Sequence, residues 1–385
     1  MDLIPRIFQC PDDSFFLFGP RGTGKSTFLL NHYPGALYID LLSPENYRKY
    51  LARPEQLTEI LSGNPNKKII VIDEIQKVPE LLSVIHQEIE KKSTRQFILT
   101  GSSSRKLRRG GSNLLGGRAL NKSFHPFMAC ELKKKFSLEK ALKQGTIPLF
   151  MTAKSPTETL DGYLTLYLKE EVVAEGMVRK IPDFARFLEV ISFSQASQLN
   201  MSEVAREAHV HRKVVESYVQ ILEELLIAFR LPVFRKRAKR AVVSHPKFFY
   251  FDCGVYKTIR PKGPLDEPEK IGGVTLETLV ASHLRAYCDY RKNEKLSLYY
   301  WRTRAGSEVD FILYGERQFL AFKVKNSKRI RSENLRGLKA FLDDFPQAKT
   351  IFLYRGEERL KKDGIFCLPV EDFLLNLNPN NTFRI

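Results

Sequence analysis

One segment near the amino terminus restricts the fold more than any other part of this 385-residue chain. It follows the apolar run Phe15–Phe18 and precedes the helix-like run Thr27–Leu30, so we expect a strand, a glycine-rich loop and a helix. Glycines let successive backbone N–H groups turn toward an anion, and the amino end of the helix adds positive potential. The loop has the pattern GxxxxGK[ST] and therefore predicts a nucleoside triphosphate site in an α/β fold: Gly19-Pro20-Arg21-Gly22-Thr23-Gly24-Lys25-Ser26.

The polar side chains of this loop have separate predicted roles. Lys25 is expected to reach the terminal phosphates, and Ser26 to offer an oxygen to Mg²⁺. The expected cofactors are therefore ATP and Mg²⁺. The residues predicted to bind the nucleotide are Gly19, Pro20, Arg21, Gly22, Thr23, Gly24, Lys25, Ser26 and Thr27.

A second segment, residues 67–74, is an apolar run that ends in two carboxylates and is typical of a buried parallel strand of the Walker B type. Asp73 is expected to hold Mg²⁺, and Glu74 to polarise the attacking water as the catalytic base. The segments 36–40 and 96–100 are predicted to join the same sheet. At the tip of the latter, Thr100 and Ser102 are candidate sensors of the γ-phosphate, although serines after strands are also ordinary turn formers.

The fifth candidate catalytic residue is Arg118, which follows two glycines in Leu115-Gly116-Gly117-Arg118-Ala119. A guanidinium matches phosphate oxygens in a bidentate manner, so Arg118 is a candidate for stabilising the transition state. The sequence leaves open whether it acts in its own subunit, in a neighbouring one, or only as a structural residue.

These motifs carry a family resemblance. GPRGTGKST, VIDEIQKVPEL, FILTGSSSRKL, GGRAL, the GTIP of residues 145–148 and YLTLYLKEEV from Tyr163 resemble, in order and spacing, the AAA-class ATPases of bacteria and archaea that carry a C-terminal domain of unknown function 4143. The resemblance implies an AAA-type core, a helical segment, a winged-helix module and a C-terminal domain related to restriction endonucleases.

The whole composition limits the class of protein. The chain is long enough for two or three domains, and 43% of its residues are hydrophobic. No segment reads as a signal peptide or a membrane span, so we expect a cytoplasmic protein without a membrane partner. Five scattered cysteines suggest neither disulfides nor zinc. The net charge of +18 favours a polyanionic partner.

The middle of the chain has helix-turn-helix features. Apolar positions from Asp183 to about Leu226 recur at helical spacing, with breaks at Leu199-Asn200 and near His209. His209 is expected to take the turn, where many such motifs carry glycine, because histidine tolerates a left-handed backbone better than most residues. The segments 231–234 and 241–243 are predicted to form the two strands of a wing.

Two interpretations of this module remain open. It either binds nucleic acid, with DNA favoured over RNA, or packs on the ATPase as a regulatory lid. Seven basic residues between Arg230 and Lys247, with no acidic residue among them, favour nucleic acid slightly. The candidate nucleic-acid contacts are Arg212, Lys213, Arg235, Arg237, Lys239 and Arg240. Of these, Arg212 and Lys213 would face a groove of the nucleic acid together with His211, Ser217 and Gln220.

The C-terminal region has an order of elements that resembles the PD-(D/E)xK nuclease core. Glu277, Asp310 and Lys325 take the positions of a helix carboxylate, a strand carboxylate and the motif lysine, while Lys323 stands where that motif needs a second acid. An ammonium group there would repel a divalent cation, so we expect a nuclease-like fold without nuclease activity. Glu308 is a possible substitute ligand.

The expected fold class is therefore α/β, with a P-loop core over residues 1–135, a helical lid or linker over 136–182, a winged helix over 183–260 and a nuclease-like domain over 261–385. The favoured function is an ATP-hydrolysing switch that binds nucleic acid. The alternatives are an ATP-controlled nuclease and an ATP-dependent regulator that binds only proteins. The sequence does not decide between a monomer and a homo-oligomer.

Overall fold

The computed structural model describes residues 3–91, 94–103, 115–164, 180–235, 244–292, 294–381 and 383. The chain divides into two compact units. One is Phe8–His125 with the short segment Glu224–Leu226, and the other comprises Met1–Ile7, Pro126–Glu223 and Ile227–Ile385. The division into four regions expected from the sequence stays a prediction, because the last three of them fall into a single unit.

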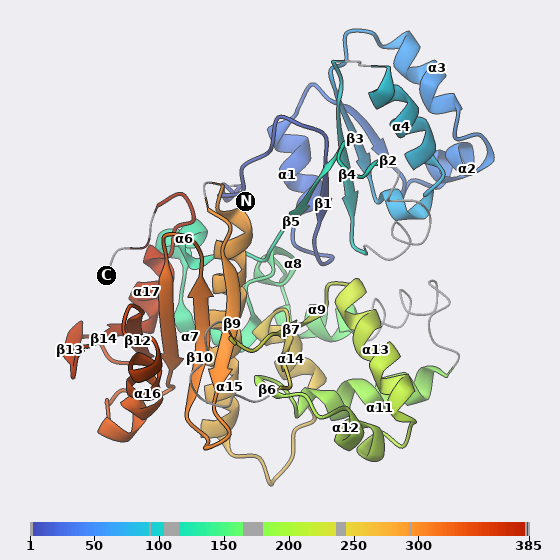
Figure 1. The fold of residues 1–385 in the computed structure, drawn as a ribbon. Helices are drawn as coiled ribbons and strands as arrows, with labels where there is room; N and C mark the ends of the chain where they lie inside the picture. Colours follow the sequence, from blue (N-terminus) through green and yellow to red (C-terminus); the bar gives the residue numbers. More distant parts are fainter. Residues whose placement is uncertain are drawn as a thin grey trace. The chain divides into compact units, whose positions relative to one another are not determined.

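The first unit is built around a parallel sheet with the strand order β2-β3-β4-β1-β5 (Figure 1). The predicted strands are present because their apolar runs are buried on both faces, as in β3, where only the first residue is partly exposed. The elements are β1 (Phe15–Phe18), α1 (Lys25–His32), β2 (Leu37–Asp40), α2 (Pro44–Ala52), α3 (Gln56–Gly63), β3 (Ile69–Asp73), η1 (Ile75–Lys77), α4 (Leu81–Glu90), β4 (Gln96–Gly101) and β5 (Leu120–Ser123).

One face of this sheet is covered by three helices. Tyr50 of α2, Leu57 of α3 and Leu82 of α4 belong to the same buried cluster as Ile70 of β3 and Phe97 of β4. A continuous apolar core thus covers this face of the sheet and holds its strands in place.

The second unit starts with short helices that include the GTIP segment. Gly145 has a left-handed backbone, with φ +77°, and the carboxylate of Asp252 takes a hydrogen bond from the backbone of Thr146 at 2.9 Å. The same carboxylate caps α14 by accepting from the backbone of Gly254 at 2.8 Å. The elements are α6 (Ala129–Leu132), η3 (Lys133–Lys135), α7 (Leu138–Gln144), α8 (Pro148–Met151), α9 (Pro156–Gly162) and α14 (Cys253–Ile259).

Three helices follow at the positions that the spacing predicts. Asn200 caps the second helix through its side chain, and His209 takes the left-handed turn with φ 53°. A small antiparallel sheet of order β6-β8-β7 completes the module. The elements are α11 (Ile181–Ser192), β6 (Ser197–Gln198), α12 (Met201–Glu207), α13 (Arg212–Glu224), β7 (Ala228–Leu231) and β8 (Lys247–Tyr250).

The strand predicted over residues 231–234 was misplaced. The observed strand β7 ends at Leu231, and the chain beyond it pairs with a different sheet, through a bridge between Val233 and Tyr300. Phe234 is buried there, because its ring packs against the aromatic cluster of the C-terminal region, including Phe341 and Phe345. The second predicted strand, 241–243, lies outside the described residues.

The C-terminal region is a mixed sheet of order β13-β14-β12-β11-β10-β9 (Figure 1). Helices cover both faces, since Ala321 packs with Leu338 of α16 while its neighbour Phe322 contacts Phe373 of α17. The elements are α15 (Pro268–Tyr290), β9 (Ser297–Arg302), β10 (Glu308–Tyr314), β11 (Phe319–Val324), η5 (Ser332–Leu335), α16 (Arg336–Asp344), β12 (Lys349–Tyr354), β13 (Leu360–Lys362), β14 (Ile365–Pro369) and α17 (Val370–Asn376).

A buried histidine makes the stability of this unit sensitive to acid. His283 of α15 donates from Nδ1 to the carbonyl oxygen of Leu279 at 2.8 Å, and its Nε2 accepts from the backbone N–H of Ala129 at 3.0 Å. Burial lowers the pKa of His283 to about 4, because the charged ring would lose water and its Nε2 could no longer accept. At pH values between about 4 and the usual pKa near 6.5, His283 is therefore protonated in the unfolded chain but neutral in the folded protein.

We expect the free energy of unfolding to fall as the pH is lowered from about 6.5 to about 4, by up to about 3 kcal/mol from this group. Thermal unfolding across this range measures the effect. In His283→Gln, which keeps an acceptor without a titrating ring, the acid-dependent loss is expected to be smaller by that amount. An identical pH dependence in both proteins would contradict this assignment.

Candidate functional site

The glycine loop has the conformation that its sequence predicts. Gly22 and Gly24 have φ of 85° and 86°, which few side-chain-bearing residues adopt. A Cβ atom on Gly19 would lie 2.3 Å from the carbonyl oxygen of Phe124, so only glycine fits at the start of the loop. The hydroxyl of Thr23 donates to the carbonyl of Pro20 at 2.8 Å and closes the turn.

The ammonium of Lys25 lies on this loop. Its Nζ donates to the carbonyl oxygen of Gly19 at 2.6 Å and to that of Pro20 at 3.4 Å, and the residue is only 5% exposed. The cation is thus held at the mouth of the loop, where the predicted phosphate position lies.

The tips of three neighbouring strands meet beside the loop. The carboxylate of Asp73, at the end of β3, accepts hydrogen bonds from the hydroxyl of Thr100 on β4 and from that of Tyr38 on β2. The start of the glycine loop is tied to β4, because the backbone N–H of Gly19 donates to the carbonyl oxygen of Gly101 at 3.2 Å. Burial, followed by the charge of Asp73, raises the pKa of the Tyr38 hydroxyl well above its usual range, so Tyr38 stays protonated and donates.

Tyr38 therefore contacts Asp73, one of the two residues predicted to hold Mg²⁺. Sequence reasoning placed residues 36–40 in the sheet but missed the role of Tyr38. The feature that could have identified Tyr38 is the parallel pairing of β2 with β3. This pairing sets Asp40 opposite Asp73 and brings the carboxyl end of β2 to the same edge of the sheet as Asp73. A serine hydroxyl and a carboxylate are hard oxygen ligands, so the residues present fit Mg²⁺.

Glu74 has its own network. Its backbone is left-handed, with φ 59°, and its N–H donates to the hydroxyl of Thr100 at 3.0 Å. The carboxylate accepts from the hydroxyl of Ser102 at 3.0 Å and from the side-chain amide of Gln76, which also donates to Ser102 at 3.0 Å. Thr100 and Ser102 thus lie against the two acidic side chains, and Gln76, which the sequence analysis missed, orients the carboxylate of Glu74.

Arg118 lies away from this group. β5 runs parallel to β1, with Leu120 opposite Phe15 and Ser123 opposite Phe18, so the glycine loop leaves from the Ser123 end and Arg118 precedes the other end. Its guanidinium forms an exposed ion pair with Glu90. This placement does not favour contact with the phosphate of its own subunit, and a role across a subunit contact stays a prediction.

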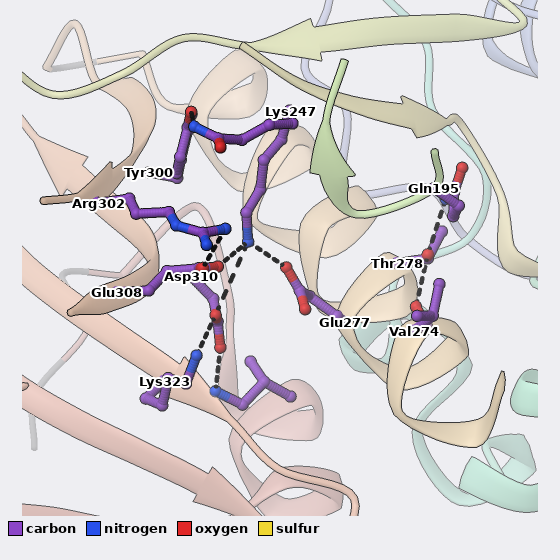
Figure 2. A network of polar contacts seen from close by, with 12 residues as sticks. Gln195, Lys247, Val274, Glu277, Thr278, Tyr300, Arg302, Glu308, Asp310 and Lys323 are labelled. Carbon is purple, nitrogen blue, oxygen red and sulfur yellow. Dashed lines mark hydrogen bonds and ion pairs between the residues drawn. The ribbon is translucent and has the colours of Figure 1, made fainter. Parts of the chain in front are cut away.

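In the C-terminal domain, three of the four residues predicted from the nuclease-like pattern, Glu277, Asp310 and Lys323, lie in one charged cluster (Figure 2). Glu277 of α15 and Asp310 of β10 face each other with Glu308 beside them, and Lys323 of β11 donates to Asp310 at 2.7 Å. The fourth, Lys325, is exposed and forms no ion pair with these carboxylates in the described part of the chain.

The centre of the cluster is filled by Lys247 of β8 (Figure 2). This lysine was counted among the basic residues that favour nucleic acid, and that interpretation of Lys247 is wrong, because the residue is 2% exposed. Burial opposes its charge, but Glu277, Glu308 and Asp310 outweigh that effect and raise the pKa of Lys247 above its usual range. In the described part of the chain, no group of three or more His, Cys, Asp or Glu side chains is arranged to hold a metal ion.

The candidate nucleic-acid contacts are only partly described. Arg212 pairs with Glu216 on the surface of α13 at 3.0 Å, and Lys213 is exposed beside it. Arg235 follows β7, while Arg237, Lys239 and Arg240 lie outside the described residues. No helix in the part of the chain that the structure describes is both long and apolar enough to cross a membrane.

Comparison with known proteins gives three matches along the chain. An AAA domain matches residues 12–133, a domain of unknown function 8612 matches residues 135–266, and a domain of unknown function 4143 matches residues 272–373. Uncharacterized proteins of Mycobacterium bovis and Mycobacterium tuberculosis are each 25% identical over 369 residues, which is 93% of this chain and 80% of the relative.

Among solved structures, AMPPCP-bound DnaA from Aquifex aeolicus has 16% identity and a TM-score of 0.25. The replication initiator DnaA bound to AMPPCP and single-stranded DNA has 15% identity and a TM-score of 0.28. Each alignment covers 55% of this chain and 82% of the other, and scores this low do not establish a shared overall fold. The family matches agree with the glycine loop and the acidic strand tip: the chain is a P-loop protein of the AAA class whose C-terminal part is the domain of unknown function 4143.

Proposed function

We propose that this chain is an ATP-hydrolysing switch whose nucleotide state changes its affinity for nucleic acid. The observation that carries the proposal is that β4 joins the glycine loop to the acidic strand tip: the N–H of Gly19 donates to the carbonyl oxygen of Gly101 at 3.2 Å, and the hydroxyl of Thr100 donates to Asp73. A loop that wraps phosphates and an acidic tip that holds a metal must adjoin for hydrolysis, and here they do.

Each side chain has a proposed part in the reaction. Lys25 and the loop N–H groups bind the β- and γ-phosphates, and Ser26 with Asp73 would hold Mg²⁺. Mg²⁺, when bound, would neutralise charge on the phosphate oxygens. Glu74 orients the attacking water. Thr100 and Ser102 fix the carboxylates of Asp73 and Glu74 and are proposed to report the loss of the γ-phosphate.

The helix-turn-helix module is proposed to be a winged helix. The order α11, β6, α12, α13, β7, β8 with sheet order β6-β8-β7 supports this interpretation. The proposed ligand is nucleic acid, DNA before RNA, because Lys213 is exposed on α13 and the net charge of the chain is +18. The C-terminal domain is proposed to be nuclease-like but inactive, since Lys247 and Lys323 hold its carboxylates.

ATP turnover measured alone and with duplex DNA, single-stranded DNA or RNA tests this function. We expect turnover that depends on Mg²⁺ and that duplex DNA increases, because a ligand that prefers one nucleotide state must shift the cycle. Turnover with no response to any nucleic acid, together with unchanged mobility of labelled DNA and RNA at low salt, would contradict the nucleic-acid part. The absence of turnover in every condition would contradict the switch itself.

A further inference from the structure

Three carboxylates of the C-terminal domain converge on one ammonium group (Figure 2). The Nζ atom of Lys247 lies 2.8 Å from Oε1 of Glu277, 2.6 Å from Oε1 of Glu308 and 3.8 Å from Oδ1 of Asp310. Oxygen atoms from a helix and a strand that meet at one point are what a hard divalent cation requires, and here that point holds a nitrogen atom.

The charges around this point are balanced. Besides Lys247, Lys323 donates to Asp310 at 2.7 Å, and Arg302 lies 3.3 Å from Glu308. Three carboxylates therefore face three cations. Since a buried carboxylate without a partner is strongly unfavourable, the cluster needs all of this positive charge, and Lys247 is the most buried source of it.

The lysine comes from a different module of the same compact unit. It opens strand β8, whose sheet belongs to the helix-turn-helix module, whereas the carboxylates belong to α15 and β10. A second polar contact joins the same two modules, because the amide of Gln195 donates to the hydroxyl of Thr278 on α15 at 2.8 Å. Charge pairing at Lys247 therefore also holds β8 in place.

We propose that the Lys247 ammonium is a built-in cation that takes the place of a divalent metal ion in this cluster and thereby fastens β8 to the C-terminal domain. Because the ammonium fills the position, a metal ion is excluded while Lys247 is seated. Without it, Glu277, Glu308 and Asp310 face only Lys323 and Arg302 and carry an excess negative charge that a divalent cation can compensate.

Thermal unfolding with Mn²⁺ or with EDTA tests this proposal in the full chain. We expect Lys247→Met, which keeps the length of the side chain without its charge, to unfold at a lower temperature, and Mn²⁺ to recover part of that loss. The rise in unfolding temperature that Mn²⁺ causes in the variant is compared with the rise in the wild-type chain. Any effect of Mn²⁺ at the glycine loop is common to the two proteins and cancels in this comparison. Faster hydrogen exchange in Phe248–Tyr250 of the variant would report the released strand.

The matched control is Lys247→Met/Glu277→Gln, which leaves two carboxylates facing two cations. It is expected to unfold at a higher temperature than Lys247→Met and to gain nothing from Mn²⁺. If Lys247→Met does not fold at all, folding of the double variant supports the proposal, and its failure to fold overturns it. A Lys247→Met chain that Mn²⁺ does not stabilise also overturns it, as does a Mn²⁺ response of the wild type that Asp310→Asn removes.

Discussion

Glu74→Gln is expected to lower the rate of ATP hydrolysis by about 100-fold or more while ATP still binds. The carboxylate is the proposed acceptor for the attacking water, and an amide of the same shape cannot take its proton. The fold should tolerate the change, because the side-chain oxygen of glutamine can still accept from Ser102 or Gln76, which hold the carboxylate now. The measurements are steady-state turnover and the affinity for a fluorescent ATP analogue.

Two further variants serve as comparisons for Glu74→Gln. Lys25→Ala is expected to lose binding itself, because the ammonium at the mouth of the loop is the predicted phosphate ligand. Glu80→Gln makes the same chemical change at an exposed position before α4 and should hydrolyse ATP like the wild type. If Glu74→Gln and Lys25→Ala both hydrolyse ATP at the wild-type rate, the assignment of this site is wrong.

Gly145→Ala is expected to destabilise the second unit by about 3–5 kcal/mol. Gly145 has φ +77°, and a Cβ atom on it would lie 1.9 Å from Oδ1 of Asp252. The carboxylate cannot move away without losing its hydrogen bonds to the backbone of Thr146 and Gly254. Steric overlap therefore adds to backbone strain, and chemical denaturation followed by far-UV circular dichroism measures the loss.

Gly364→Ala is the matched control for this prediction. Gly364 also has a positive φ, +80°, but no atom lies within 4 Å of the position of its Cβ. Its replacement should cost only about 1 kcal/mol, the usual strain of a left-handed residue. Equal losses at Gly145 and Gly364 would show that strain alone matters and that the contact with Asp252 does not.

Local patterns predicted much of this fold. The glycine loop, β3 with its two carboxylates and the left-handed turn at His209 follow from short segments, because apolar runs and glycine positions depend on neighbouring residues only. The strand at 231–234 was misplaced because Phe234 is apolar for a different reason, its burial in a distant aromatic cluster.

Two roles that the sequence analysis missed, those of Tyr38 and Lys247, depend on contacts across long separations in the chain. Tyr38 reaches Asp73 from a neighbouring strand, and Lys247 reaches Glu277 from another module. Tyrosine in a strand and lysine in a basic stretch have many ordinary explanations, so no local pattern distinguished them. Their environment appears only when the strands are paired and the helix is packed.

The sequence by itself determined that this protein has a phosphate-binding loop, an acidic strand to complete it and a C-terminal set of carboxylates with a lysine among them. Each of those features is a pattern of residue types at fixed spacing along the chain, and a short segment of sequence is enough to show it. Only the tertiary structure decided which hydroxyls hold the carboxylate of the acidic strand, which end of the sheet holds Arg118 and which cation neutralises the C-terminal carboxylates. Charge pairing and burial depend on distances in space, and strand pairing and packing set those distances.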